Sequence, residues 1–101
     1  MNSYAFAIVD ELRRCGADMF FVSPGSRSTP LVAAIANNPF LKYQICHDER
    51  SAAYAAIGYA KARKMPAVLV CTSGTAVANY FPAVIEAKSD SVPLIVLSSD
   101  R

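Results

Sequence analysis

The stretch that decides the fold is "AVLVCTSGT", residues 67–75. Five consecutive apolar residues have the length of a strand, and the polar turn that follows them contains a glycine. A strand that is apolar at every position, rather than at every second one, is typical of a sheet covered on both faces. The stretch therefore indicates a buried strand of a parallel sheet, ending in a polar loop.

Three other stretches repeat this arrangement, and we predict strands in "MFFVS" (19–23), "YQICH" (43–47) and "PLIVLSS" (93–99). Capping residues, breakers and apolar periodicity predict helices that start at Ser3, at Ser28 or Thr29, at Asp48 and at Ala76, the last of them kinked near Pro82. Gly16 lies where a left-handed residue ends a helix. Because helix and strand alternate four times, we expect an α/β fold with a parallel sheet and helices on both faces.

Composition narrows the classes of protein that fit. The 101 residues suffice for one domain or part of one, and 53% hydrophobic against 18% charged residues favours a packed core over disorder. A net charge of +2 with scattered basic residues argues against nucleic acid as a partner. The apolar runs are far shorter than the roughly 20 residues of a membrane span, and the first residues do not resemble a secretory signal.

The three cysteines are Cys15, Cys46 and Cys71, and they form no CxxC pair. With only one histidine in the chain, a zinc site built from them is not expected, and we assign no metal ligand. We predict buried, reduced thiols in a reducing compartment.

Parallel strands joined by right-handed crossovers place their carboxyl ends along one edge of the sheet. The polar loops 23–27, 47–50, 71–75 and 98–101 would therefore share that edge. Open α/β sheets bind ligands there, so we expect the functional site in these four loops.

Two of the loops suit a ligand without requiring one. "SPGSRSTP" (23–30) combines a glycine, hydroxyls, Arg27 and a helix start, which suits an anion, although a capped turn with a solvated arginine gives the same pattern. "TSGT" (72–75) is as compatible with a structural turn as with a ligand contact.

The loop "HDER" (47–50) raises a sharper question. Asp48 is in the right place to cap the following helix. Glu49 could merely exploit the positive end of that helix with Arg50 as a surface partner, or it could face the cleft, partly desolvated, and move a proton. His47 fits either a cleft group or an ordinary residue at a strand end.

Four segments together resemble a known family: "FVSPGSRSTPL", "HDERSAAYAAIGYAKA", "VCTSGTAVANYFPAVIEA" and "LIVLSSDR". They are similar, in order and spacing, to the N-terminal domain of the 2-succinyl-5-enolpyruvyl-6-hydroxy-3-cyclohexene-1-carboxylate synthases. These are thiamine diphosphate-dependent enzymes of menaquinone and phylloquinone biosynthesis. The PGSRSTPL element is the specific part of the match, whereas an acidic residue after the second strand and a TSGT-like turn occur more widely among thiamine enzymes.

The resemblance implies a role for six residues of this chain. Glu49 matches the glutamate that hydrogen-bonds N1′ of the cofactor's aminopyrimidine and is thus the implied catalytic residue. Thr75 and Asn79 match positions near the pyrimidine pocket. Ser26 and Arg27 match residues that contact the acceptor substrate, and Arg101 matches a further anion-binding arginine.

The resemblance also implies the reaction, decarboxylation of 2-oxoglutarate and addition of the remaining four-carbon unit to isochorismate. Residues 1–101 would form most of one pyrimidine-binding domain, without the central domain or the diphosphate-binding domain that holds the cofactor's diphosphate and Mg²⁺. Because half or more of each active site would then be missing, we expect the isolated chain to be inactive. The resemblance further implies a homodimer or tetramer with active sites shared between chains. It implies a location in a bacterial cytoplasm or a plastid stroma.

Two other functions stay open at this point. One is a different thiamine-dependent decarboxylase or carboligase of the acetolactate synthase type, which leaves residues 26–28 unexplained. The other is a non-catalytic α/β module that binds an anion or a protein partner and has no need of Glu49.

Overall fold

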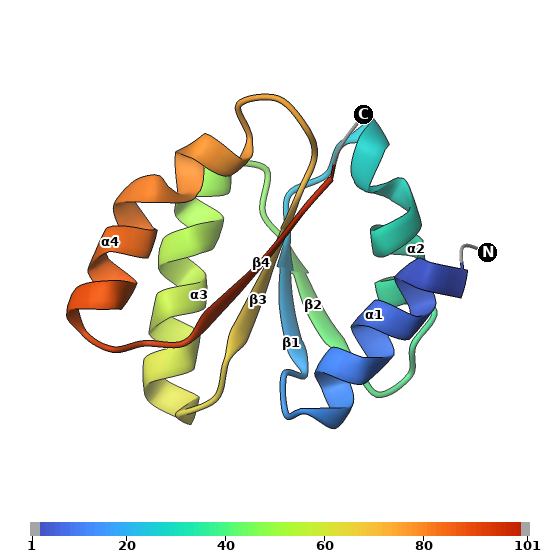
Figure 1. The fold of residues 1–101 in the computed structure, drawn as a ribbon, viewed down its shortest axis with the longest axis horizontal. Coiled ribbons are helices and arrows are strands. Elements are labelled where there is room, and N and C mark those ends of the chain that lie inside the picture. Colours follow the sequence, from blue (N-terminus) through green and yellow to red (C-terminus); the bar gives the residue numbers. More distant parts are fainter. Residues whose placement is uncertain (1–2, 100–101) are drawn as a thin grey trace.

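The fold was obtained as a computed structural model, which describes residues 3–99 (Figure 1). Its elements, where η denotes a short 3₁₀ helix, are α1 (Ser3–Arg14), β1 (Met19–Val22), η1 (Ser26–Ser28), α2 (Thr29–Ala36), β2 (Lys42–Ile45), α3 (Glu49–Arg63), β3 (Ala67–Cys71), η2 (Val77–Tyr80), α4 (Phe81–Ser89) and β4 (Leu94–Ser98).

The sheet has four parallel strands in the order β2-β1-β3-β4. Helices α1 and α2 cover one face and α3 and α4 the other, as Figure 1 shows. Because successive residues of a strand point to opposite faces, Phe20 and Val22 pack under α1 and α2, while Phe21 and Leu69 pack under α3 and α4. The predicted α/β fold, a parallel sheet with helices on both faces, is confirmed.

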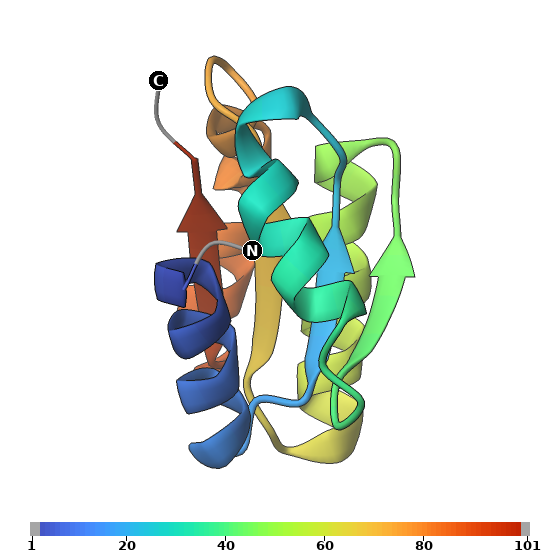
Figure 2. The same ribbon diagram turned by 90° about the vertical axis from the view of Figure 1, so that its right-hand side faces the viewer.

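Burial differs between central and edge strands. Every residue of β3 is buried, as its sequence predicts, and β1 is nearly so. All four residues of β2 are exposed, and β4 is half-buried with its last residue exposed, so the prediction that every strand is covered on both faces is wrong for β2 and only partly met by β4. The reason is that these two strands lie at the edges of the sheet; the place of β2 is visible in Figure 2. The side chains of Lys42 and Gln44 in β2 reach solvent.

The segment after β3 also departs from the prediction of one kinked helix. A turn of 3₁₀ helix, η2, leads into α4, and Pro82 lies in the first turn of α4. A proline there costs no hydrogen bond, because the first N–H groups of a helix have no intrahelical partner, so the helix begins near Pro82 instead of bending at it. Gly16 does end α1 as predicted, with a φ of 105°.

The cysteines are all free, but they are not equally buried. Cys71 is buried, Cys46 is half-buried and Cys15 is exposed. The prediction of three buried thiols is therefore wrong for Cys15, which follows the last residue of α1 at the surface. None of the helices within residues 3–99 is long and apolar enough to cross a membrane.

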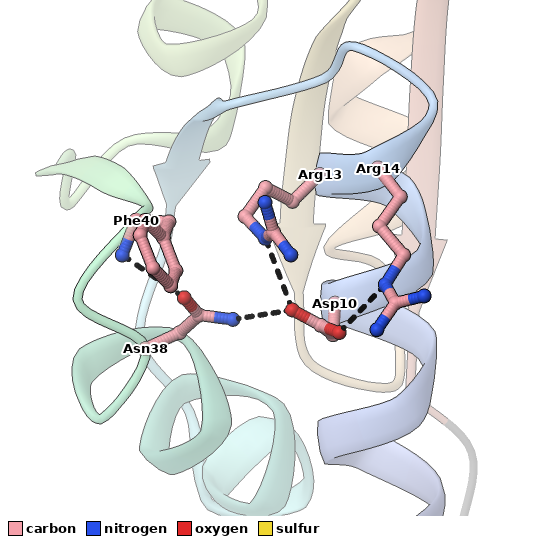
Figure 3. A network of polar contacts seen from close by, with 5 residues as sticks. All are labelled: Asp10, Arg13, Arg14, Asn38 and Phe40. Carbon is pink, nitrogen blue, oxygen red and sulfur yellow. Dashed lines mark hydrogen bonds and ion pairs between the residues drawn. The ribbon is translucent and has the colours of Figure 1, made fainter.

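A polar network ties α1 to the loop after α2 (Figure 3). Asp10 accepts hydrogen bonds from Arg13 Nε at 3.0 Å, from Arg14 Nε at 3.2 Å and from Asn38 Nδ2 at 3.2 Å. Asn38 Oδ1 in turn accepts from the backbone N–H of Phe40, whose ring lies 4.7 Å from the Arg13 guanidinium. These contacts account for the burial of Asn38, a polar residue that is only 4% exposed.

Candidate functional site at the carboxyl edge of the sheet

The loops after β1 and β3 leave the sheet from neighbouring strands and in opposite directions (Figure 1). The first leads to α2 and on to β2, and the second leads to α4 and on to β4. Neighbouring strands whose connections diverge in this way form a topological switch point, where open α/β sheets bind their ligands. The order of the strands therefore places the candidate site between these two loops.

At this point the two loops touch through Gly25 and Thr72. Gly25 has an extended backbone (φ −177°) that any residue adopts, so its lack of a side chain is what the site requires. A β-carbon at position 25 would lie 2.3 Å from Cβ, 2.6 Å from Cγ2 and 2.7 Å from Oγ1 of Thr72. The backbone N–H of Arg27 also donates a hydrogen bond to Thr72 Oγ1 at 3.3 Å.

Ser26 and Arg27, the predicted substrate-binding pair, lie in η1 with both side chains exposed. Among the described residues Arg27 forms no ion pair, so its guanidinium is available to an anion. Ser28 occupies the cap position of α2, but the predicted hydroxyl cap is not made, because Ser28 Oγ donates to the carbonyl of Gly25 at 3.0 Å instead. Ser28 thereby closes the η1 turn with its own side chain.

At the start of α3, two adjacent acidic residues have different roles. Asp48 caps the helix as predicted, since its Oδ2 accepts from the backbone N–H of Ser51 at 3.2 Å and from Ser51 Oγ at 2.7 Å. These hydrogen bonds lower the pKa of Asp48 below its usual value. Glu49, the first residue of α3, is half-buried beside it and takes no part in the cap.

Glu49 lies close to a group of buried polar residues that the sequence analysis did not find: Ser23, Cys71 and Tyr80, each at most 1% exposed. Burial raises the pKa of Tyr80 far above its usual value, and the neighbouring Cys71 thiol and Glu49 carboxylate add to the shift. Burial likewise raises the pKa of Cys71, with a further contribution from Glu49. Glu49 thus contributes to the electrostatic surroundings of these two buried groups.

Two hydroxyls of this group have no well-formed hydrogen bond. Ser23 Oγ and Tyr80 OH are both buried and unpartnered among the described residues, although each neighbours the other. In native proteins a buried hydroxyl group nearly always has a hydrogen-bond partner. Their one sequence signal is a serine directly after an apolar strand; the tyrosine in η2 looks like an ordinary core residue.

Two more predicted site residues follow β3: Thr75 lies in the loop after this strand and Asn79 in η2. Thr75 and Asn79 are exposed and adjacent, since Asn79 Nδ2 donates to the Thr75 carbonyl at 3.1 Å. Arg101 lies outside the described residues. His47 is exposed at the start of the turn into α3.

A hollow of about 480 Å³ is lined by none of the predicted site residues. Its lining is apolar and comes from η2, α4 and β4: Val77, Ala78, Tyr80, Phe81, Val84 and Val96. Tyr80 belongs both to the lining of this hollow and to the buried polar group near Glu49. The hollow is thus a neighbouring apolar surface, and the polar chemistry belongs to the loops.

Comparison with known proteins gives a consistent result. The family model described as "Thiamine pyrophosphate enzyme, N-terminal TPP binding domain" matches residues 2–101. Curated relatives named 2-succinyl-5-enolpyruvyl-6-hydroxy-3-cyclohexene-1-carboxylate synthase include those of Pelodictyon phaeoclathratiforme (62% identical over 93% of this chain) and Chlorobaculum tepidum (63% over 93%). The synthase of Chlorobium luteolum is 60% identical over 97% of the chain. The chain spans only 16–17% of the length of these relatives.

Proposed function

The chain belongs to the thiamine pyrophosphate enzymes as their N-terminal TPP-binding domain, and on this premise we propose that it is part of a 2-succinyl-5-enolpyruvyl-6-hydroxy-3-cyclohexene-1-carboxylate synthase. The full-length enzyme would decarboxylate 2-oxoglutarate and add the four-carbon unit to isochorismate, in menaquinone or phylloquinone biosynthesis. Identity of about 60% with synthases of that name supports the assignment.

The single observation that carries the proposal is the position of Glu49. The carboxyl group at the start of α3 is half-buried, and its charge contributes to the raised pKa values of Cys71 and Tyr80. A carboxyl group in this place can exchange a proton with a heterocyclic nitrogen at hydrogen-bonding distance. Asp48 makes this possible, because it caps the helix and leaves Glu49 free for the ligand.

The residues present fit the aminopyrimidine of thiamine diphosphate. A flat ring with nitrogen donors and acceptors needs a carboxyl group, further polar partners and an apolar surface. Glu49 supplies the first, the exposed polar side chains of Thr75 and Asn79 are candidates for the second, and the apolar hollow beside Tyr80 supplies the third. When bound, the cofactor supplies the carbon that adds to the keto group of the donor and accepts the electron pair left when carbon dioxide departs. Thr75 and Asn79 would line the pyrimidine pocket.

Ser26 and Arg27 would hold the acceptor. Isochorismate and 2-oxoglutarate both carry carboxylates, and a guanidinium binds a carboxylate through two parallel hydrogen bonds. Arg27 is exposed at the switch point without an ion-pair partner among the described residues, which supports this role. Arg101 is proposed as a second anion-binding arginine on the resemblance alone.

Residues 1–101 would form most of the pyrimidine-binding domain, and the central and diphosphate-binding domains would come from sequence outside this chain. The diphosphate-binding domain would hold Mg²⁺ and the diphosphate. A second copy of the full-length chain would complete each active site. Exposed apolar side chains on η2 and α4, namely Val77, Phe81, Val84 and Ile85, support a protein partner on that face. A bacterial cytoplasm or a plastid stroma is the proposed location.

The test is turnover of a full-length synthase that contains this sequence, supplied with thiamine diphosphate, Mg²⁺, 2-oxoglutarate and isochorismate. Glu49→Gln keeps the shape of the side chain but removes its acid–base function, so we expect kcat to fall by about 10²- to 10⁴-fold. Glu11→Gln, an exposed glutamate on α1, serves as the matched control and should not change kcat. Unreduced turnover in Glu49→Gln would remove the mechanism.

The same assay separates the two alternatives. An acetolactate synthase-type enzyme would consume pyruvate and ignore isochorismate. A non-catalytic anion-binding module would bind carboxylates equally well with Glu49 and with Glu49→Ala, and the wild type would have no turnover.

A further inference from the structure

We propose that Thr72 is a positioning residue, which joins the loop after β1 to the loop after β3 and so sets the position of Arg27 for the acceptor carboxylate. The inference rests on the proposed function, because it takes the acceptor to be the ligand of Arg27. The pattern "TSGT" alone does not distinguish Thr72 from its neighbours; only the contact with the other loop does.

Thr72 contacts the β1 loop in two ways. Its hydroxyl accepts a hydrogen bond from the backbone N–H of Arg27, 45 residues earlier in the chain. Its β-carbon and methyl group occupy the space that a side chain at position 25 would need. The first contact fixes the backbone from which the guanidinium extends, and the second fixes how closely the two loops approach.

The η1 turn depends on such support. It is three residues long and exposed at Ser26 and Arg27. Its other described hydrogen bonds are local: Ser28 donates to the Gly25 carbonyl, and the backbone N–H of Thr29 donates to the Ser26 carbonyl. Those local bonds keep the shape of the turn but do not attach it to the rest of the edge. Among the described residues, Thr72 supplies the hydrogen bond that links η1 to the neighbouring loop.

The position of this contact gives it a functional consequence. The β1 loop carries the proposed acceptor-binding pair, and the β3 loop carries Thr75, proposed to lie at the cofactor. A link between these loops at the switch point therefore holds the backbone of Arg27 in place before the acceptor binds, so that less binding free energy is lost in ordering the turn.

The experiment uses the full-length synthase with Thr72→Val and Thr72→Ser. Valine keeps the β-carbon and the branched shape but removes the acceptor oxygen, whereas serine keeps the oxygen and loses the methyl group. We expect Thr72→Val to raise the KM for isochorismate about tenfold, the effect of losing one ordinary hydrogen bond, and to leave kcat at saturation within about twofold. Thr72→Ser should restore the wild-type KM, and Ser89→Ala, at the exposed end of α4, should have no effect.

A second measurement does not depend on activity. Hydrogen exchange, followed by mass spectrometry, should be about tenfold faster at the Arg27 amide in Thr72→Val than in the wild type, and unchanged in Thr72→Ser. Thr72→Ala provides a second hydroxyl-free variant if the valine enzyme fails to fold, with the same expected faster exchange.

The outcomes separate this inference from the function on which it rests. A wild-type enzyme that ignores isochorismate, but whose Arg27 amide responds to Thr72→Val as expected, overturns the proposed function and leaves the loop contact standing. An active wild type with equal KM and equal exchange in Thr72→Val overturns the positioning role. A fall in kcat with unchanged KM also overturns it, because the effect would then lie at the reacting centre instead of at acceptor binding.

Discussion

The carboxylate of Asp48 accepts hydrogen bonds from both the backbone and the side chain of Ser51, and this closes the first turn of α3 around Glu49. The helix thus begins at Glu49 without using the Glu49 side chain as its cap. Two adjacent carboxylates, which have the same chemistry in the sequence, receive different tasks because one of them is occupied by the backbone.

The first prediction concerns this cap. Asp48→Ala removes both hydrogen bonds to Ser51 and should lower the midpoint of urea unfolding, whereas Asp48→Asn keeps an acceptor oxygen and should retain most of the stability. In a full-length synthase, Asp48→Ala should also lower kcat, since Glu49 would no longer start from a fixed helix end. Equal unfolding midpoints for the alanine and asparagine variants would show that the cap contributes nothing.

The second prediction concerns acid stability. Hydrogen bonds from Arg13 and then Asn38 are the main causes that hold the pKa of Asp10 below its usual 3.8. A depressed pKa in the folded state stabilises the fold fully above the unfolded value, and the contribution is lost as the pH falls through the folded value. Between about pH 5 and pH 2 the unfolding free energy of the wild type should therefore fall more steeply than that of Asp10→Asn.

Chemical denaturation at a series of pH values measures this difference. The two proteins should converge at the acid end, where Asp10 is protonated and its pairing with Arg13 and Arg14 is lost. Parallel curves across the whole range would contradict the role of the network in Figure 3.

The third prediction tests the close approach of the two loops. Gly25→Ala introduces a β-carbon 2.3 Å from that of Thr72, so the loops must separate, and we expect a loss of about 1–3 kcal/mol of stability. Gly58→Ala is the matched control: nothing lies within 4 Å of a β-carbon at this position in α3, and the change should stabilise the helix by about 0.5–1 kcal/mol. Combining Gly25→Ala with Thr72→Gly should cost less than the sum of the single changes.

The fourth prediction concerns buried hydroxyls. Tyr80 OH is buried without a well-formed hydrogen bond, so Tyr80→Phe should leave the free energy of unfolding unchanged or increase it. Tyr59 OH donates to Asp18 Oδ1 at 3.2 Å, and Tyr59→Phe should therefore destabilise by about 1 kcal/mol. A loss in Tyr80→Phe as large as that in Tyr59→Phe would show that the Tyr80 hydroxyl has a partner, with Cys71 and Ser23 as the candidates.

Most of the secondary structure could be predicted because its causes are local. The Asp48 cap joins residues three positions apart, the Gly16 stop depends on one backbone angle, and apolar runs of strand length mark β1, β3 and β4. The predictions were less accurate where burial depends on neighbours. β2 was expected to be covered on both faces, and its exposure follows from its place in the sheet, which no local pattern encodes.

The candidate site also has features that local sequence predicts and features that depend on the tertiary structure. The residue types alone show that the carboxyl-edge loops are polar and that a glutamate directly follows a helix cap. They suffice because the end of a strand and the cap of a helix each depend on residues that are neighbours in the chain. Only the tertiary structure brings Gly25 against Thr72 and sets Ser23, Cys71 and Tyr80 beside Glu49. Apart from Cys71 and Tyr80, these groups lie far apart in the chain, and the loops that carry them meet because strand order places β1 next to β3, a pairing that depends on the packing of the whole sheet.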